Sequence, residues 1–184
     1  MQETPHGPDL AYSASLALRI GGAVFVACPD ERLQAVYYRV DAGVRAVWRH
    51  LRGSEINQEL LRSAEQANHE LVRRASALTV PEEFVTGFRD LAAASLGQLA
   101  RGEAVSRDEL SSRAVEVAGF LESGLQSAAG AVDFERSCQA SCESLLGSWA
   151  DDPLSTMRRV RRETDVWALS YQRFVRPEVS SQPG

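Results

Sequence analysis

The densest cluster of like charge in the sequence is a run of four arginines, interrupted by one valine, at positions 158–162. On a helix, which turns about 100° per residue, these side chains spread over more than half of the circumference. Arg158 and Arg162 share a face, and two guanidinium groups one turn apart can hold a carboxylate or phosphate with paired hydrogen bonds. The alternative is a solvated face, or one that pairs with acids of another helix such as Asp151 or Glu143.

The other two arginines of the run have acidic residues one helical turn further on. Glu163 follows Arg159 by four residues. Asp165 follows Arg161 at the same spacing. Such pairs stabilise a helix weakly, and the order with the basic residue first is the weaker one. The spacing therefore predicts ion pairs within the helix for Arg159 and Arg161, and it leaves Arg158 and Arg162 for recognition of an anion or a partner.

Histidine is scarce, and only His69 has an acidic neighbour at helical spacing, Glu65. Residues four apart share a face, so this pair could orient an imidazole or bind a metal. A ferritin-like di-iron site needs Glu-x-x-His twice, whereas here the spacing is one residue longer and occurs once. We favour a solvated surface pair flanked by Glu70 and Arg73, and we predict no metal site. A role in a pocket, with Asn68 beside Glu65 and His69, is the alternative.

Cys138 and Cys142 also lie four residues apart, while Cys28 is distant in the sequence. Tetrahedral zinc needs four ligands, and no second Cys or His pair at a usual spacing supplies them. Both cysteines fall on a stripe with Phe134 and Leu145, which favours a role as small buried apolar residues. A redox switch is the alternative, and it would require exposure and a lowered thiol pKa. We predict no cofactor, and an odd cysteine count without a disulfide framework suits a reducing, cytoplasmic compartment.

Aromatic residues gather at helical spacing in two places. Trp167 and Tyr171 lie one turn apart, with Phe174 on a neighbouring face. The second group is Tyr37, Tyr38 and Trp48. Aromatics at this spacing are usually core residues, and we favour that interpretation. The alternative is that they wall a pocket for a flat ligand between helices, where ligand sites of helical bundles commonly lie.

The composition excludes several classes of chemistry. The chain has 184 residues and 20 basic residues, none of which is lysine, so no Schiff base and no phosphate-binding P-loop lysine is available. Arginine in place of lysine indicates a bacterial source with a GC-rich genome. A net charge of −5 argues against general nucleic-acid binding, which draws its affinity from phosphate neutralisation. Dinucleotide-binding, zinc-protease and serine-hydrolase motifs are not found in the sequence.

The apolar and acidic segments near the N-terminus predict neither a signal peptide nor a membrane span. The first eighteen residues lack the basic segment of a standard signal peptide. The longest apolar run, residues 20–28, is far shorter than a bilayer span. We predict flexible tails at 1–8 and 176–184 and one helical domain at 9–175, without membrane contact.

Helical periodicity predicts an all-α, single-domain bundle of six to seven helices, mostly antiparallel because the connections are short. Residues 10–28 are ambiguous: they fit a helix, which we favour, or a short hairpin turning at Gly21-Gly22, since two glycines cost a helix about 2 kcal/mol. The expected start and stop signals are Pro29 to Gly53, Ser54 to Leu78, Pro81 to Gly102, Ser106 to Gly130, Asp133 to Trp149, and Asp152-Pro153 to Phe174.

These patterns support two functional hypotheses. The first is a non-catalytic domain that binds a protein partner or a small effector in a regulatory role. The second is an enzyme or ligand-binding protein with an aromatic-lined pocket and an arginine or histidine contact; the sequence does not decide whether catalysis occurs. A third, weaker idea is a toxin, effector or immunity protein that avoids lysine as a conjugation site. The partner classes left open are a protein, a small anionic or aromatic ligand, and a second copy. The candidate site residues are Arg158, Arg162, His69, Glu65, Trp167 and Tyr171.

Overall fold

The computed structural model describes residues 7–176, which fold into seven α-helices and two short 3-10 helices without a strand. The predicted all-α bundle is confirmed, with helices as the only repeating element of the described chain. The α-helices are α1 (Gly7–Ala27), α2 (Glu31–His50), α3 (Gln58–Arg73), α4 (Glu82–Arg101), α5 (Arg107–Gly124), α6 (Ala131–Leu146) and α7 (Pro153–Val175). The 3-10 helices are η1 (Ala75–Ala77) and η2 (Gln126–Ala128).

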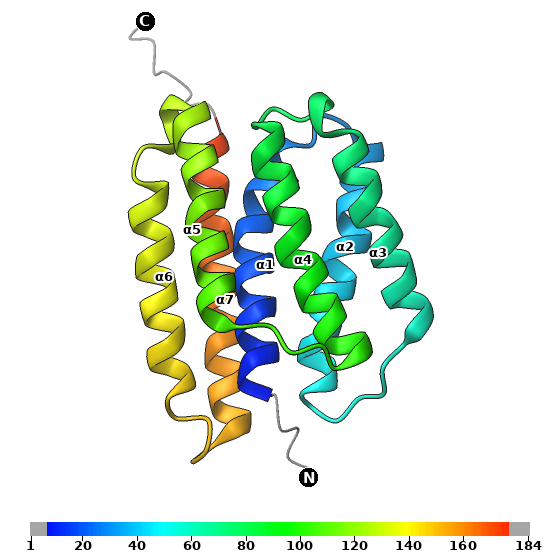
Figure 1. Ribbon diagram of the computed structural model, residues 1–184, viewed down its shortest axis with the longest axis vertical. Helices are drawn as coiled ribbons and strands as arrows, with labels where there is room; N and C mark the ends of the chain where they lie inside the picture. Colours follow the sequence, from blue (N-terminus) through cyan, green and yellow to red (C-terminus); the bar gives the residue numbers. More distant parts are fainter. Residues whose placement is uncertain (1–6, 177–184) are drawn as a thin grey trace, which may run out of the picture.

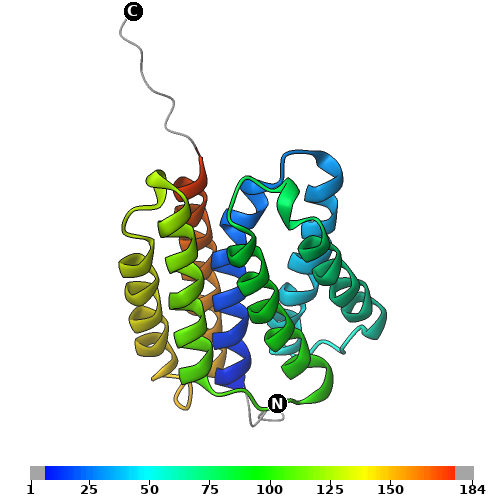
Figure 2. The same ribbon diagram turned by 45° about the horizontal axis from the view of Figure 1, so that its top comes forward.

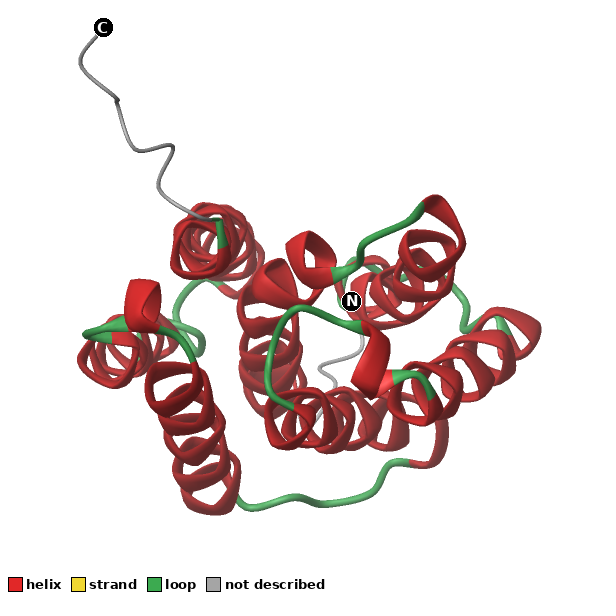
Figure 3. Ribbon diagram, turned by 90° about the horizontal axis from the view of Figure 1, so that it is seen from above, coloured by secondary structure: helices red, strands yellow, loops and turns green. Residues whose placement is uncertain are grey.

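Helix α1 lies at the centre of the molecule, between two groups of three helices. Helices α5, α6 and α7 form one group and α2, α3 and α4 form the other (Figure 1). Turning the molecule keeps this division visible (Figure 2), and the view from above shows that helices joined by loops make up the described part (Figure 3). Helix α1 packs most extensively against α7 on one side and against α4 and α2 on the other.

The ambiguous segment at 10–28 is helical, and tertiary packing explains why its two glycines do not break it. A Cβ at Gly22 would collide with the backbone carbonyl of Ala168 in α7. A Cβ at Gly21 would lie 2.8 Å from the hydroxyl of Tyr37 in α2. Close packing on both sides of α1 therefore offsets the helix propensity that the glycines lack.

Burial on all sides makes α1 a core helix. It is long and apolar enough to cross a membrane, but 89% of its most apolar window is buried inside the protein. A helix that is apolar on most sides and covered by other helices is the pattern of a central core helix.

Several predicted boundaries need correction. Gly7 and Pro8, which the predicted tail at 1–8 included, belong to α1. Residues 1–6 and 177–184 lie outside the described part. Helix α3 begins after Asn57 and not after Ser54, because the Asn57 side chain accepts a hydrogen bond from the Leu60 amide at 3.0 Å. Asparagine at this position satisfies an otherwise unpaired amide of the first turn.

Other expected helix starts are confirmed by capping hydrogen bonds. Ser106 accepts from the Glu109 amide at 3.5 Å, and Asp152 accepts from the Ser155 amide at 3.0 Å. Three expected helix ends were too late: α3 ends at Arg73, α5 at Gly124 and α6 at Leu146, each followed by a turn or a short 3-10 helix. Periodicity continues across such turns, which is why it overestimates helix length.

Candidate functional site

One face of α7 presents five exposed side chains in a single stripe. Their spacing places them within about 80° of the helix circumference. Two of them are apolar: Val166 is 50% exposed and Leu169 is 60% exposed. Tyr38 on α2 is the third large hydrophobic side chain that is exposed in the described part of the chain. The α7 stripe consists of Arg158, Arg162, Val166, Leu169 and Arg173.

The ion pairs predicted within α7, Glu163 with Arg159 and Asp165 with Arg161, do not form. Asp165 binds Arg45 of α2 at 2.8 Å and not Arg161, so that predicted pair is wrong. Glu163 lies 3.7 Å from Arg162, beyond hydrogen-bond distance, and the expected pair with Arg159 does not form. The tertiary neighbour outcompetes the local one because a helix surface offers little to fix an i,i+4 pair in the weaker orientation.

Arg158, Arg159 and Arg161 form no ion pair with any residue between 7 and 176. The alternative partners considered for Arg158 and Arg162, Asp151 and Glu143, do not bind them within that range. These guanidinium groups are therefore available to an acid or phosphate from outside.

A shallow groove between α6 and α7 adjoins the stripe and has a volume of about 790 Å³. On the α6 side three of the four lining side chains are small, so the two helices leave space between them. The walls are Ala140, Ser141, Ser144 and Leu145 on α6, and Arg159, Arg162, Glu163 and Trp167 on α7. Of the six candidate residues from the sequence, the groove brings together Arg162 and Trp167.

A buried arginine of α1 stacks on the ring of Trp167. Its ring lies over the guanidinium of Arg19 in α1, with 5.6 Å from the guanidinium carbon to the ring centre. Arg19 is completely buried, and a cation stacked on an indole away from water is an attractive contact. The Trp167 ring therefore enters the groove as a wall whose orientation is already fixed.

Arg19 and Glu135 form a fully buried ion pair between α1 and α6. Arg19 Nε donates to Glu135 Oε2 at 3.0 Å, and Arg19 Nη2 donates to Oε1 at 2.5 Å. Tyr171 Oη and Gln139 Nε2 donate to the same carboxylate at 2.8 and 2.9 Å. Four donors thus surround Glu135, which is the condition under which a buried carboxylate is tolerated.

A second branch of this network runs from Arg19 to α7. Arg19 Nη1 donates to Ser15 Oγ at 3.2 Å, and Ser15 lies 2.7 Å from Thr164 Oγ1. The Thr164 hydroxyl donates its proton to the Val160 carbonyl at 2.8 Å, so Ser15 must be the donor to Thr164. Because each hydroxyl has a single proton to donate, the direction of each hydrogen bond is determined. Both hydroxyl groups of the branch, those of Ser15 and Thr164, donate one hydrogen bond and accept another.

The ionisation states of the network follow from its burial. Burial alone would lower the pKa of Arg19, but the charge of Glu135 and its hydrogen bonds raise that pKa above the ordinary value. Burial, followed by the charge of Glu135, raises the pKa of Tyr171. Arg19 is therefore a permanent cation and Tyr171 a neutral donor at physiological pH. The structure places Tyr171 in the core as part of this network and not at the surface.

The three cysteines are buried and free, as was expected of Cys138 and Cys142. Burial raises the pKa of Cys138 to about 12 and that of Cys28 to about 11. Burial also raises the pKa of Cys142. A thiol whose pKa is raised is a poor nucleophile, so these positions do not offer the exposed, activated thiol that a redox switch needs.

Glu65 and His69 do not form a site together. Glu65 accepts from Arg101 of α4 at 2.8 Å, while His69 is exposed on α3. No group of three or more potential metal ligands is found among residues 7–176. Asn68 turns inward, and its Nδ2 donates to the Arg89 carbonyl at 2.9 Å.

The aromatic residues are divided between core and surface. Tyr37, Trp48 and Tyr171 are buried as expected, whereas Tyr38 is 54% exposed. Phe134 of α6 contacts both Tyr171 and Phe174 edge-on, which closes α6 onto α7 at the end opposite the groove. Aromatic packing thus fixes one end of the α6–α7 pair, and small residues leave the other end open.

The sequence interpretation missed Arg19 and Glu135. The available signal was a single arginine within the apolar segment 10–28, because a buried guanidinium requires a carboxylate from elsewhere. The sequence could not show which of 25 acidic residues supplies it.

Comparison with known proteins gave no match: no family model, no curated protein and no solved structure is significantly similar to this chain.

Proposed function

We propose that this protein is a non-catalytic binding module whose α7 stripe docks an acidic segment of a protein partner. The observation that carries the proposal is the order of side chains along the stripe. Val166 and Leu169 form an exposed apolar centre, with Arg162 before it and Arg173 after it. An apolar centre with a charged rim is the usual anatomy of a protein interface, and arginine is enriched there.

The groove beside the stripe adds a rigid anchor point. Trp167 is stacked on Arg19, so little conformational entropy is lost when a partner side chain packs against the indole. Trp and Arg are the residues most often found at binding hot spots. The small residues of α6, including Ser141 and Ser144, leave room for an apolar side chain of the partner beside Trp167.

Charge complementarity favours an acidic partner over a second copy of this chain. If two copies met through their α7 stripes, an antiparallel arrangement would bring Arg162 opposite Arg173, and a parallel one would bring each arginine opposite itself. Like charges placed together at an interface are repulsive. The partner segment we propose therefore carries apolar side chains flanked by aspartate or glutamate, as on one face of an amphipathic helix.

We further infer that the protein works in a reducing compartment such as the cytoplasm of a bacterial cell. Cys28, Cys138 and Cys142 are free and buried, and none is paired in a disulfide. Intact-mass measurement of the native protein after alkylation under denaturing, non-reducing conditions should count three free thiols. A mass two hydrogens lower, with a single alkylated thiol, would contradict this inference.

The docking proposal is tested with a defined peptide. The probe is a helical peptide with leucines along one face flanked by glutamates, and its control carries glutamine in place of every glutamate. Binding is measured by fluorescence anisotropy at two salt concentrations. We expect the acidic peptide to bind, the glutamine peptide to bind at least tenfold more weakly, and added salt to weaken binding because the charges are exposed.

Matched variants locate the binding surface. Arg158→Gln combined with Arg162→Gln should weaken binding about tenfold, which corresponds to about 1.4 kcal/mol for two exposed pairs. Arg32→Gln with Arg62→Gln removes the same charge from exposed positions on α2 and α3 and should leave the affinity unchanged. Equal losses in both variants, or no binding of the acidic peptide, would refute the docking surface.

A further inference from the structure

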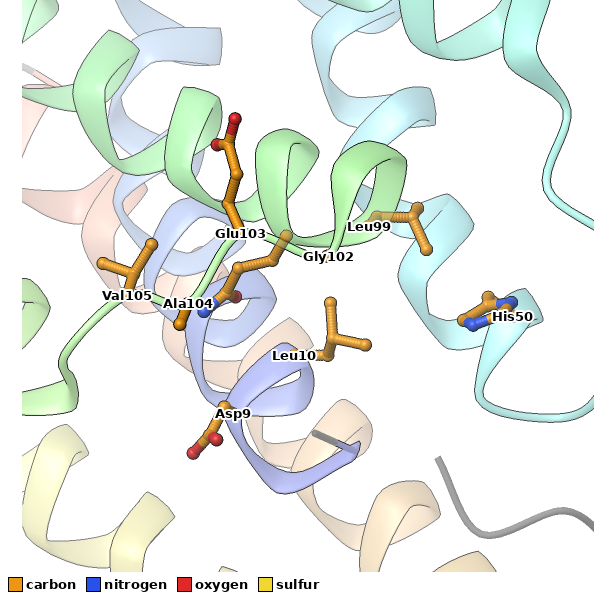
Figure 4. Close-up of a pocket in the computed structure, with 9 residues that line it drawn as sticks. Asp9, Leu10, His50, Leu99, Gly102, Glu103, Ala104 and Val105 are labelled. Carbon is orange, nitrogen blue, oxygen red and sulfur yellow. The ribbon is translucent and has the colours of Figure 1, made fainter. Parts of the chain in front are cut away.

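We propose that a cavity at the N-terminal end of α1 binds a small uncharged molecule that carries one ring or a short apolar chain and a hydrogen-bond acceptor. The cavity is separate from the α7 stripe and has a volume of about 200 Å³. It lies between the start of α1, the ends of α2 and α4, and the connection from α4 to α5 (Figure 4). The lining residues are Asp9, Leu10, His50, Gln98, Leu99, Gly102, Glu103, Ala104 and Val105.

The size and lining of the cavity suit one ring. Leu10 and Leu99 face the same space, with His50 at its far side (Figure 4). Ala104 and Val105 of the connecting segment complete an apolar wall. An engineered apolar cavity of about 150 Å³ is large enough to hold benzene, so a volume of about 200 Å³ accommodates a six-membered ring with short substituents.

Gln98 supplies the polar contact. Its side chain is 93% buried, with a relative exposure of 7%, and it lines the cavity. Its Oε1 accepts a hydrogen bond from the Ser13 hydroxyl at 2.5 Å, while its Nε2 has no partner among residues 7–176. An amide donor without a protein partner at the wall of an apolar cavity can donate its hydrogen bond to a ligand oxygen there.

The charged residues at the rim do not offer a net charge to the ligand. Asp9 is bound by Arg107 at 2.6 Å, and Glu103 is bound by Arg101 at 2.5 Å. Both carboxylates point away from Leu10 (Figure 4). Because each rim carboxylate is already paired with a guanidinium, the cavity selects for an uncharged molecule.

The connection between α4 and α5 provides the way in. It leaves α4 at Gly102, which has a φ of 67°. Between there and Ser106, residues 103–105 make no backbone–backbone hydrogen bond within the described chain. A segment with few such bonds opens at low free-energy cost, so this wall can move aside while the helices stay in place.

The test uses two molecules of nearly identical shape, p-cresol and p-xylene, in which a hydroxyl replaces a methyl group. Binding to the full chain is followed by NMR of the leucine methyl groups. We expect p-cresol to bind with a Kd on the order of 0.1–1 mM, as its eight heavy atoms allow, and to contact Leu10 and Leu99. Because only p-cresol can accept the Gln98 hydrogen bond, p-xylene should bind at least fivefold more weakly.

Variants separate the cavity from unspecific partitioning. Ala104→Phe places a ring at the exposed wall and should abolish p-cresol binding. Its control, Ala77→Phe, makes the same change at an exposed position of η1 and should bind p-cresol as the wild type does. Gln98→Met keeps the length of the side chain without the amide, and it should equalise the two affinities.

Some outcomes overturn the proposal without depending on any variant. Equal affinity of the wild type for p-cresol and p-xylene would refute the role of Gln98. Absence of saturable shifts at Leu10 and Leu99 would refute the cavity as a binding site. Unchanged p-cresol binding in a folded Ala104→Phe protein would place the ligand elsewhere.

Discussion

The two groups of helices around α1 differ in whether their buried polar atoms are hydrogen-bonded. Towards α5–α7, the fully buried Arg19, Glu135 and Thr164 are all hydrogen-bonded. Towards α2–α4, three buried atoms have no partner in the described chain. They are Trp48 Nε1, Asn68 Oδ1 and Ser95 Oγ. One side of the molecule is a closed polar network, and the other is an apolar core with unpaired polar atoms.

This difference predicts how each side responds to substitution. A charged network in which every member is paired tolerates loss of a member badly, because the remaining charge stays buried without compensation. An unpaired polar atom contributes no bond, so its removal has little cost. We therefore expect substitutions of buried polar residues to destabilise the α5–α7 side strongly. We expect the α2–α4 side, which includes the cavity beside Gln98, to tolerate them better.

The largest expected effect is loss of the carboxylate in the network. Glu135→Ala should destabilise the protein by about 3–5 kcal/mol, because it leaves Arg19 buried and uncompensated. Arg19→Met combined with Glu135→Leu should recover most of that loss, since it removes both charges together. Urea unfolding followed by circular dichroism measures both free energies. A loss below about 1 kcal/mol for Glu135→Ala would show that the network does not set the stability of this side.

Two neighbouring glycines of α1 face the two groups of helices, so alanine substitutions at these positions compare how tightly each group packs against α1. Gly22→Ala should cost about 1–3 kcal/mol, because the new Cβ meets the backbone of Ala168, which cannot move without shifting α7. Gly21→Ala meets the ends of the Tyr37 and Phe88 rings at 2.8 and 3.1 Å, which can shift, and alanine favours the helix. Its net effect should stay within about 1 kcal/mol. The melting temperatures of the two variants rank their stabilities. A larger loss of stability for Gly21→Ala than for Gly22→Ala would contradict the expected difference between the two sides.

The smallest effects come from single hydroxyl groups. Thr164→Val removes the acceptor of the Ser15 hydroxyl and should cost about 1–2 kcal/mol. Ser95→Ala removes a hydroxyl without a partner and should be neutral or stabilise by up to about 1 kcal/mol. Both are measured by urea unfolding in the same buffer. A destabilising Ser95→Ala would indicate that this hydroxyl has a partner, such as a buried water molecule.

Most of the fold could be predicted from periodicity and capping, and the errors have physical causes. Asp152 and Ser106 begin helices as expected because a cap depends on residues within one turn. Helix α3 is capped by Asn57 and not by Ser54 as predicted. Both residue types suit the position, so local sequence does not choose between them. The segment 10–28 stayed ambiguous because the close approach of α7 at Gly22 and of Tyr37 and Phe88 at Gly21 cannot be seen in the sequence.

The candidate site was predicted only in part. Arg162 and Trp167 both line the groove although they lie about 140° apart around α7, because the α6 side leaves space there. The pair of Asp165 with Arg45 joins α7 to α2, and no spacing within the sequence indicates it. Gln98 was missed because a single glutamine in an apolar helix has no distinctive pattern.

By itself, the sequence determined the all-helical class, the caps at Asp152 and Ser106, and the lack of lysine chemistry, because each follows from residues close together or from composition. Only the tertiary structure decided that Arg19 pairs with Glu135, 116 residues away, and that Gln98 faces a cavity. Burial creates the first feature, because a guanidinium needs a carboxylate only once water is excluded. The packing of α1 against the ends of α2 and α4 creates the second.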